Sequence, residues 1–426
     1  MKKFLSIKAI IFSLCMCLTG CGEESPQPDE VEEKEKQEIT IAVGDTLSLL
    51  YSDVFEGFNE QSTEYYITVL SDKSDYNAFR EKIMKEIESG KGPDIMTLDF
   101  LNVFDYIAAG YLQSWDGAFS EEEKETLFLP GVFGYGMYDD KLYGFPYQWT
   151  AHVLISSSER CNGLENWDIR QMQECVKNTD AKCLASSLNG MDLVNSAVLC
   201  DKTNQDFIDW DKKTCNFMQQ EFYDFLKFAK TYEAKQEKTS FFDDKTGVNS
   251  GEEFGWYANF AFCRMNYYEA VFGGEVTYIG FPTGYTENLF LNSSCENKEG
   301  AYAFLRYLLS KDVQNMLVKE QVDSGTMGSF SIRKDTMDYH IELERTARQN
   351  MSAFELFGEL YGNPAMTDNQ EVQARKLIEN VVFYDHEMSE IYVCTANALY
   401  GYFYGEQTEE ETAALVQQAM EEYLRE

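Results

Sequence analysis

The chain has 426 residues and a formal net charge of −37, from 73 acidic and 36 basic residues. This balance excludes nucleic acid as a ligand, because phosphate backbones are bound by clustered lysine and arginine side chains and the sequence has no such cluster. It also argues against binding of the protein surface to an anionic membrane. A neutral or cationic small solute is compatible with it.

The first 20 residues are typical of a secretion signal. Lys2 and Lys3 precede an apolar run, residues 9–18, that is shorter than the roughly 20 residues needed to span a bilayer. The segment ends in Leu18-Thr19-Gly20-Cys21, which resembles the lipobox of bacterial lipoproteins, where the cysteine is lipidated and becomes the mature N-terminus. We predict a signal peptide at residues 1–20, lipidation of Cys21 and a lipid-anchored position on the extracytoplasmic face of the cell membrane. The alternative is an ordinary cleaved signal that happens to end in a cysteine.

Residues 22–38 are rich in glutamate and contain two prolines, with Val31 as their one apolar side chain. Such a composition buries too little apolar surface to order itself. We therefore interpret residues 21–38 as the lipidated cysteine and an acidic tether.

About 390 residues follow the tether, which is enough for two domains with their own cores. The three histidines, His152, His340 and His386, are not at the spacing of a metal motif. We expect no metal or other cofactor.

Eight cysteines remain once Cys15, Cys17 and Cys21 are set aside, and five of them crowd one region. These five are Cys161, Cys175, Cys183, Cys200 and Cys215. In an oxidising compartment such crowding favours a disulfide, but buried free thiols fit equally well. Both alternatives stay open.

The N-terminal part of the body alternates strands and helices. Apolar periodicity predicts strands at residues 39–43, 66–70 and 94–98, with helices at 47–58 and 79–87 between them. This order predicts an α/β fold with a mostly parallel sheet, whose ligands gather at the carboxyl ends of the strands. Asp45 and Asp99 both follow such ends and are candidate ligand contacts.

The C-terminal third is predicted to be helical. An apolar stripe marks a helix over residues 301–309. Thr408 and Glu411 form a capping-box pattern ahead of a second apolar stripe over residues 415–424.

Four short elements resemble, in the same order, those of the family 1 extracellular solute-binding proteins of bacterial ABC importers. They are Lys91-Gly92-Pro93-Asp94-Ile95, residues 140–147 (DKLYGFPY), residues 297–305 (NKEGAYAFL) and residues 404–411 (YGEQTEEE). The family's version of the second element reads Gly-Lys-Leu-Tyr-Gly-Ile-Pro. One departure is the run at residues 153–158 (VLISSS), where the family commonly has Tyr-Asn-Lys.

This resemblance implies a two-lobed periplasmic-binding-protein-like fold with a hinge and a cleft between the lobes. On the family's pattern of crossovers, lobe 1 comprises residues 39–147 and 286–324, and lobe 2 comprises residues 148–285 and 325–426. It also implies a monomer that binds a small solute and passes it to an ABC transporter permease.

Aromatic side chains are the other candidate ligand contacts, because a flat apolar face with a polar edge suits a sugar ring or a peptide side chain. The candidates are Tyr147, Trp149, Trp256, Tyr267 and Tyr384. The resemblance suggests Tyr267 or Tyr268 as a ligand-facing ring, and the alternative is that both pack inside the lobe. Asp94 is expected to make structural hydrogen bonds to backbone.

The function predicted from these features is capture of a carbohydrate or oligosaccharide without catalysis. One alternative is a surface lipoprotein that senses a ligand or serves as a scaffold, and another is a peptide or amino-acid binder of the same fold. A secreted hydrolase is a weaker alternative: the sequence has no Gly-x-Ser-x-Gly or His-Glu-x-x-His motif, although a glycosidase needs only two placed carboxylates.

Overall fold

The computed structural model describes residues 35–44, 51–72, 74–97, 103–163, 169–185, 187–200, 206–233, 250–324, 329–346, 354–356, 359–361 and 365–425. Lys36–Glu426 form one compact unit, separate from Met1–Glu35. The predicted signal peptide, Cys21 and most of the tether lie outside the described residues, and so do Asp45 and Asp99.

The predicted alternation of strands and helices at the N-terminal end of this unit is confirmed. The elements are β1 (Gln37–Ala42), α2 (Ser52–Gln61), β2 (Tyr65–Leu70), α3 (Tyr76–Glu88) and β3 (Ile95–Met96). Both β2 and β3 pair with β1 in parallel. Asp94 is structural as expected, but its partner is distant in sequence: its Oδ2 accepts hydrogen bonds from both the backbone and the hydroxyl of Thr40, each at 2.8 Å.

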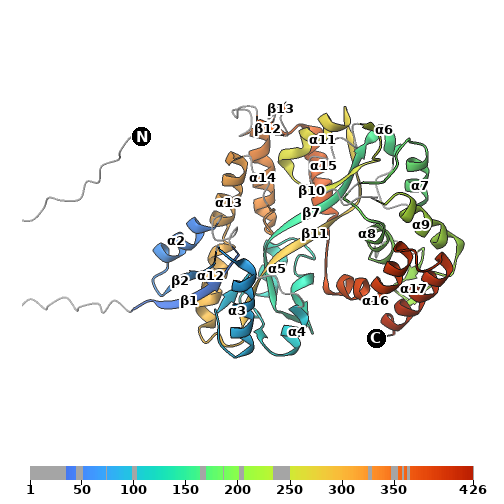
Figure 1. Cartoon of the computed structure of the whole chain (residues 1–426). Helices are drawn as coiled ribbons and strands as arrows, with labels where there is room; N and C mark the ends of the chain where they lie inside the picture. Colours follow the sequence, from blue (N-terminus) through green and yellow to red (C-terminus); the bar gives the residue numbers. More distant parts are fainter. Residues whose placement is uncertain are drawn as a thin grey trace, which may run out of the picture. The chain divides into compact units, whose positions relative to one another are not determined.

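Two long strands continue this sheet across the unit (Figure 1). They are β7 (Gly144–Ser157) and β11 (Val276–Asn292), which pair antiparallel over most of their length. The main path of the sheet is β10-β7-β11-β3-β1-β2, with β10 at Trp256–Phe260, and β4 (Leu112–Gln113) and β14 (Val382–Phe383) also pair with β11. The prediction of a mostly parallel sheet is therefore wrong beyond the first strands, because β7 and β11 run antiparallel to each other.

Apolar side chains form two large clusters in the described residues. The first surrounds β1, the inner faces of β7 and β11, and the helices α2, α11 (Met265–Phe272), α12 (Lys298–Leu308), α14 (Lys334–Thr346) and α15 (Asp368–Glu379). The second joins α7 (Ile169–Lys177), α8 (Gly190–Val194), α9 (Gln220–Thr231), α16 (His386–Phe403) and α17 (Glu409–Tyr423). Helix α13 (Lys311–Ser324) packs beside α14.

Shorter elements connect these parts. They are α4 (Val103–Ala108), α5 (Glu121–Leu127), η1 (Gly134–Gly136), β5 (Met137–Tyr138), β6 (Lys141–Leu142), α6 (Ser158–Cys161), the π-helical turn η2 (Asn195–Leu199), β8 (Ile208–Asp209), β9 (Thr214–Cys215), η3 (Phe262–Arg264), β12 (Phe354–Leu356) and β13 (Glu359–Tyr361).

Local signals explain the helix starts in the C-terminal third. The capping box predicted at Thr408 and Glu411 is present at the start of α17. Helix α12 begins three residues before the predicted stripe, because the Asn297 side chain accepts a hydrogen bond from the backbone of Gly300 and caps it.

None of the eight cysteines in the described residues forms a disulfide, so the free-thiol alternative holds in this structure. No described helix is both long and apolar enough to cross a membrane.

Candidate aromatic binding site

Eight rings that are not fully buried follow one another across the unit, and we call them the aromatic row. They are Phe104, Tyr135, Tyr138, His152, Tyr257, Tyr285, Tyr384 and His386. In space the row runs from Tyr257 through His152, Tyr285, Tyr384 and Tyr135 to Phe104, which neighbours both Tyr138 and His386. Successive ring centroids are 3.9 to 6.3 Å apart, a range in which aromatic rings interact favourably. The row therefore combines flat apolar ring faces with the polar edges of its tyrosines and histidines.

The centre of the row is formed by strands of the shared sheet. Tyr285 on β11 stacks on Tyr384, which follows β14, with ring centroids 5.5 Å apart. The ring of His152 on β7 lies 5.0 Å from that of Tyr285 and 5.7 Å from that of Tyr257 on β10. Tyr285 is the most open of the four, with 37 % of its surface exposed.

The other end of the row comes from elements near the N-terminal sheet. The ring of His386, at the start of α16, lies edge-on to Phe104 of α4 at 3.9 Å and 5.7 Å from Tyr138 of β5. Tyr135 of η1 is 6.3 Å from Tyr384. Residues before β7 and residues after β14 therefore meet in the row.

Backbone geometry fixes the hairpin that carries Tyr138. Asp139 and Asp140 both have positive φ, at 48° and 59°, in the two-residue turn between β5 and β6. Beneath it, a Cβ built on Gly136 would lie 1.8 Å from the carbonyl oxygen of Gly144, so the two chain segments approach as only glycine allows.

Two carboxylates lie beside the row. Glu390 of α16 is 3.4 Å from Nδ1 of His386, and Asp192 of α8 acts on Tyr257 and Tyr285. The loop ahead of α8 is held there by a 2.6 Å hydrogen bond from the Ser187 hydroxyl to the backbone oxygen of Tyr257. Asn189 caps the helix and donates from its side chain to the Asp192 carboxylate at 2.6 Å. Burial raises the pKa of Asp192, because the charged form is desolvated.

The charge of Asp192 acts on the neighbouring rings. Burial raises the pKa of Tyr257 and Tyr285, and the negative charge of Asp192 raises both further. Tyr392 of α16, whose pKa rises to about 12 through burial and the neighbouring Tyr400, also responds to Asp192. Burial lowers the pKa of His152, so its imidazole favours the neutral form. The site thus offers a carboxylate, several phenols and a neutral imidazole as hydrogen-bonding groups.

The described aromatic candidates from the sequence fall into two groups. Tyr384 is part of the aromatic row. Trp149, 1 % exposed, lies in the first cluster, where its Nε1 donates to the backbone oxygen of Ser331 at 2.9 Å. Tyr147 is also buried, and its hydroxyl donates to Glu287 at 2.7 Å.

Trp256 and Tyr267 pack against each other in the same cluster, with ring centroids 5.7 Å apart. Tyr267 is 2 % exposed and Tyr268 is fully buried. Of the two alternatives, a ligand-facing ring or two packed rings, this structure has the packed arrangement. A ligand contact by Tyr147, Trp149, Trp256 or Tyr267 stays a prediction. It would require the residues that now pack over these side chains to move away.

Sequence reasoning missed the other seven rings of the row and Asp192. The available signal was weak: Tyr135 and Tyr138 both precede the double-aspartate turn, and Asp192 follows an asparagine with helix-capping character. Within the described residues, no group of three or more His, Cys, Asp or Glu side chains is arranged to hold a metal ion.

Comparison with known proteins gives the chain's relatives. The family model described as "Bacterial extracellular solute-binding protein" matches residues 45–315, more than half of the chain. No curated protein matches it significantly.

Several solved structures match nearly the whole chain at low sequence identity. The GacH receptor of Streptomyces glaucescens, solved unliganded and with acarbose, has 16 % identity and a TM-score of 0.58, with 92 % of this chain and 100 % of that chain covered. The cyclic α-maltosyl-1,6-maltose binding protein of Arthrobacter globiformis has 13 % identity, the same coverage and a TM-score of 0.60. A solute-binding protein of Thermotoga lettingae bound with α-D-tagatose has 16 % identity and a TM-score of 0.55, with 91 % and 100 % covered.

These neighbours share the two-lobed α/β architecture of periplasmic binding proteins, as the sequence predicts. The chain belongs to the bacterial extracellular solute-binding proteins.

Proposed function

We propose that this protein captures a carbohydrate, most simply an oligosaccharide, on the aromatic row and delivers it to the permease of an ABC importer. The observation that carries the proposal is the continuity of the row from Phe104 through Tyr135, Tyr384, Tyr285 and His152 to Tyr257. A row of several ring faces offers successive sugar rings an apolar surface, while the phenol edges, His152 and Asp192 exchange hydrogen bonds with hydroxyl groups. The solved structures with acarbose and tagatose support the same ligand class.

The proposed lobes meet where β7 and β11 cross from one to the other. The boundaries 147/148 and 285/286 lie close together in the ladder, in which Gln148 pairs with Glu287, and the register shifts at Glu287/Asn288. An interrupted ladder bends more readily than a regular one. Closure about this point would press Phe104, Tyr135 and Tyr138 of lobe 1 against a ligand held on lobe 2.

The proposed position at the membrane follows from the N-terminal sequence. A lipid on Cys21 and an acidic tether over residues 22–38 would hold the binding unit near its permease on the extracytoplasmic face. We propose that the binding unit acts as a monomer.

Isothermal titration calorimetry of the full chain in detergent tests the ligand class. Malto-, cello- and chito-oligosaccharides are compared with peptides and amino acids, and each sample is analysed afterwards for cleavage products. Binding of an intact sugar, with a dissociation constant near micromolar (about −8 kcal/mol), is the expected result. If only peptides bind, the ligand belongs to the peptide class and not to the carbohydrates. Sustained cleavage of a sugar or peptide would contradict a role in binding alone.

A further inference from the structure

We infer that the solute carries a positive charge, as in an amino sugar, and that Asp192 is the residue that selects it. This inference rests on the proposed function and names the chemical class of the ligand more narrowly. It starts from Asp192 because this carboxylate, unlike Glu390 beside His386, has no ion-pair partner among the described residues.

Asp192 lacks a cation of its own. Its carboxylate accepts a neutral hydrogen bond from the Asn189 amide, and no ion pair joins it to a lysine, arginine or histidine of the described chain. His152 does not compensate the charge, because burial lowers its pKa and favours the neutral imidazole. A partly buried carboxylate without a counter-ion is an unfavourable arrangement that a bound cation relieves.

The surroundings of Asp192 favour a cation for a second reason. The Ser187 hydrogen bond ties the loop before Asp192 to Tyr257, and the charge of Asp192 raises the pKa of Tyr257, Tyr285 and Tyr392. The face of an aromatic ring attracts cations through its quadrupole, by about 0.5 to 2 kcal/mol depending on solvation. An ammonium group near Asp192 would therefore gain from both the carboxylate and the rings, whereas a neutral hydroxyl gains only a hydrogen bond.

Helix packing holds Asp192 in this position. A Cβ built on Gly190 would lie 2.1 Å from the Phe403 ring, so the start of α8 packs directly on α16, the helix that carries Tyr392. The Ser187 hydrogen bond ties the other side of the loop to β10. The carboxylate is thus placed by two independent contacts. The chain's net charge of −37 adds a long-range attraction for cations.

Matched tetrasaccharides test the inference by calorimetry on the full chain at pH 6 and low salt. The fully deacetylated glucosamine tetramer is charged, and its N-acetylated counterpart and maltotetraose are neutral. We expect the amine form to bind at least tenfold more tightly than either neutral sugar. This preference should shrink at 0.5 M salt, because the charge interaction is screened.

In the Asp192→Asn variant, affinity for the charged tetramer should fall at least tenfold more than affinity for the neutral sugars, and Asp192→Glu should recover part of this difference. Asp224→Asn is the matched control, since Asp224 lies exposed on α9 and accepts a hydrogen bond only from Gln220 among the contacts found. Its preference should equal that of the unmodified chain. Thermal unfolding of each variant verifies the fold.

The outcomes separate this inference from the proposed function. Equal binding of charged and neutral sugars, or an equal loss of both in Asp192→Asn, overturns the charge selection and leaves carbohydrate binding intact. Binding of linear polyamines but no sugar, abolished in Asp192→Asn, upholds the cation site and overturns the carbohydrate class. Absence of binding to every sugar and polyamine overturns both.

Discussion

Tyr285 presents the most open ring of the aromatic row, and its contribution to binding is measurable with little effect on folding. Replacing Tyr285 by alanine removes a face that stacks on Tyr384. We expect a loss of about 1 to 1.5 kcal/mol in binding free energy, roughly tenfold in affinity, by calorimetry with the best sugar of the panel.

Tyr404→Ala is the control for this change. Tyr404 is 77 % exposed and stacks on Tyr400, outside the aromatic row. Its removal should leave affinity unchanged. Equal losses in both variants would contradict the assignment of the row as the binding surface.

The backbone of Asp140 is in the left-handed conformation, which glycine adopts without strain. Its φ is 59°, and the related family element has glycine at this position. We expect Asp140→Gly to raise the free energy of unfolding by about 0.5 kcal/mol in urea titrations, because relief of the strain slightly exceeds the added freedom of the unfolded chain. The same replacement at Asp224, inside α9, should lower it by a similar amount. A decrease at both positions would mean that the Asp140 side chain stabilises the turn.

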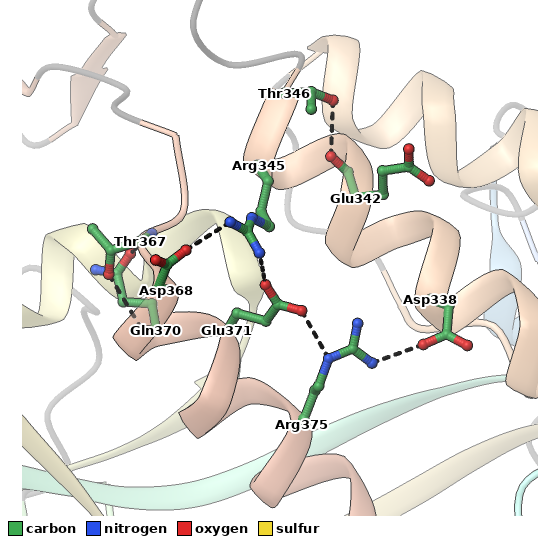
Figure 2. Close-up of polar contacts among 9 residues, drawn as sticks. All are labelled: Asp338, Glu342, Arg345, Thr346, Thr367, Asp368, Gln370, Glu371 and Arg375. Carbon is green, nitrogen blue, oxygen red and sulfur yellow. Dashed lines mark hydrogen bonds and ion pairs between the residues drawn. The ribbon is translucent and has the colours of Figure 1, made fainter.

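At the level of elements, a network of ion pairs connects α14 to α15 (Figure 2). Arg345 pairs with Asp368 at 2.6 Å and with Glu371, and Arg375 pairs with Glu371 at 2.9 Å and with Asp338 at 2.7 Å. Glu371 lies at the centre of this network. The hydrogen bond from Arg375, with support from Arg345, holds its pKa below the ordinary glutamate value.

Glu371→Gln should lower the free energy of unfolding by about 1 kcal/mol at pH 7, because both arginines lose their shared carboxylate. A carboxylate with a lowered folded-state pKa stabilises above its unfolded pKa of about 4.3 and loses that effect as the pH falls through the folded value. The difference from the unmodified chain should therefore be constant above about pH 5 and shrink below about pH 4.

Urea titrations across this pH range measure the difference. Glu342→Gln on α14 is the control, since the carboxylate of Glu342 has no drawn contact with the network in Figure 2. A difference for Glu371→Gln that does not change with pH would show that shape, and not charge, underlies the effect.

At the scale of the whole unit, the proposed hinge predicts a change in dimensions. Small-angle X-ray scattering should show a smaller radius of gyration when saturating sugar is added, because the lobes close on the ligand. Tyr285→Ala should show the same contraction only at higher sugar concentration. An unchanged radius with bound sugar would rule out closure and favour a preformed site.

Much of the fold was predictable because its signals are local. The alternation of Ile39 and Ile41, the stripe of α12 and the capping box of α17 each depend on neighbours within a few residues. The antiparallel return of β11 along β7 was not predictable in this way, since the two strands are more than a hundred residues apart.

The candidate site was largely unpredictable for the same reason. Its rings come from strands, turns and helix starts across the chain, and tertiary packing alone separates exposed Tyr285 from buried Tyr147. With 15 % aromatic residues, ring type does not distinguish a binding surface from a core. Tyr384 was identified by type, and its role depends on a partner, Tyr285, that lies a hundred positions earlier.

The absence of disulfides among the described cysteines has a consequence for how the protein folds outside the cytoplasm. No cross-link among these eight cysteines is part of the fold. Folding of the described residues therefore includes no step of thiol–disulfide exchange.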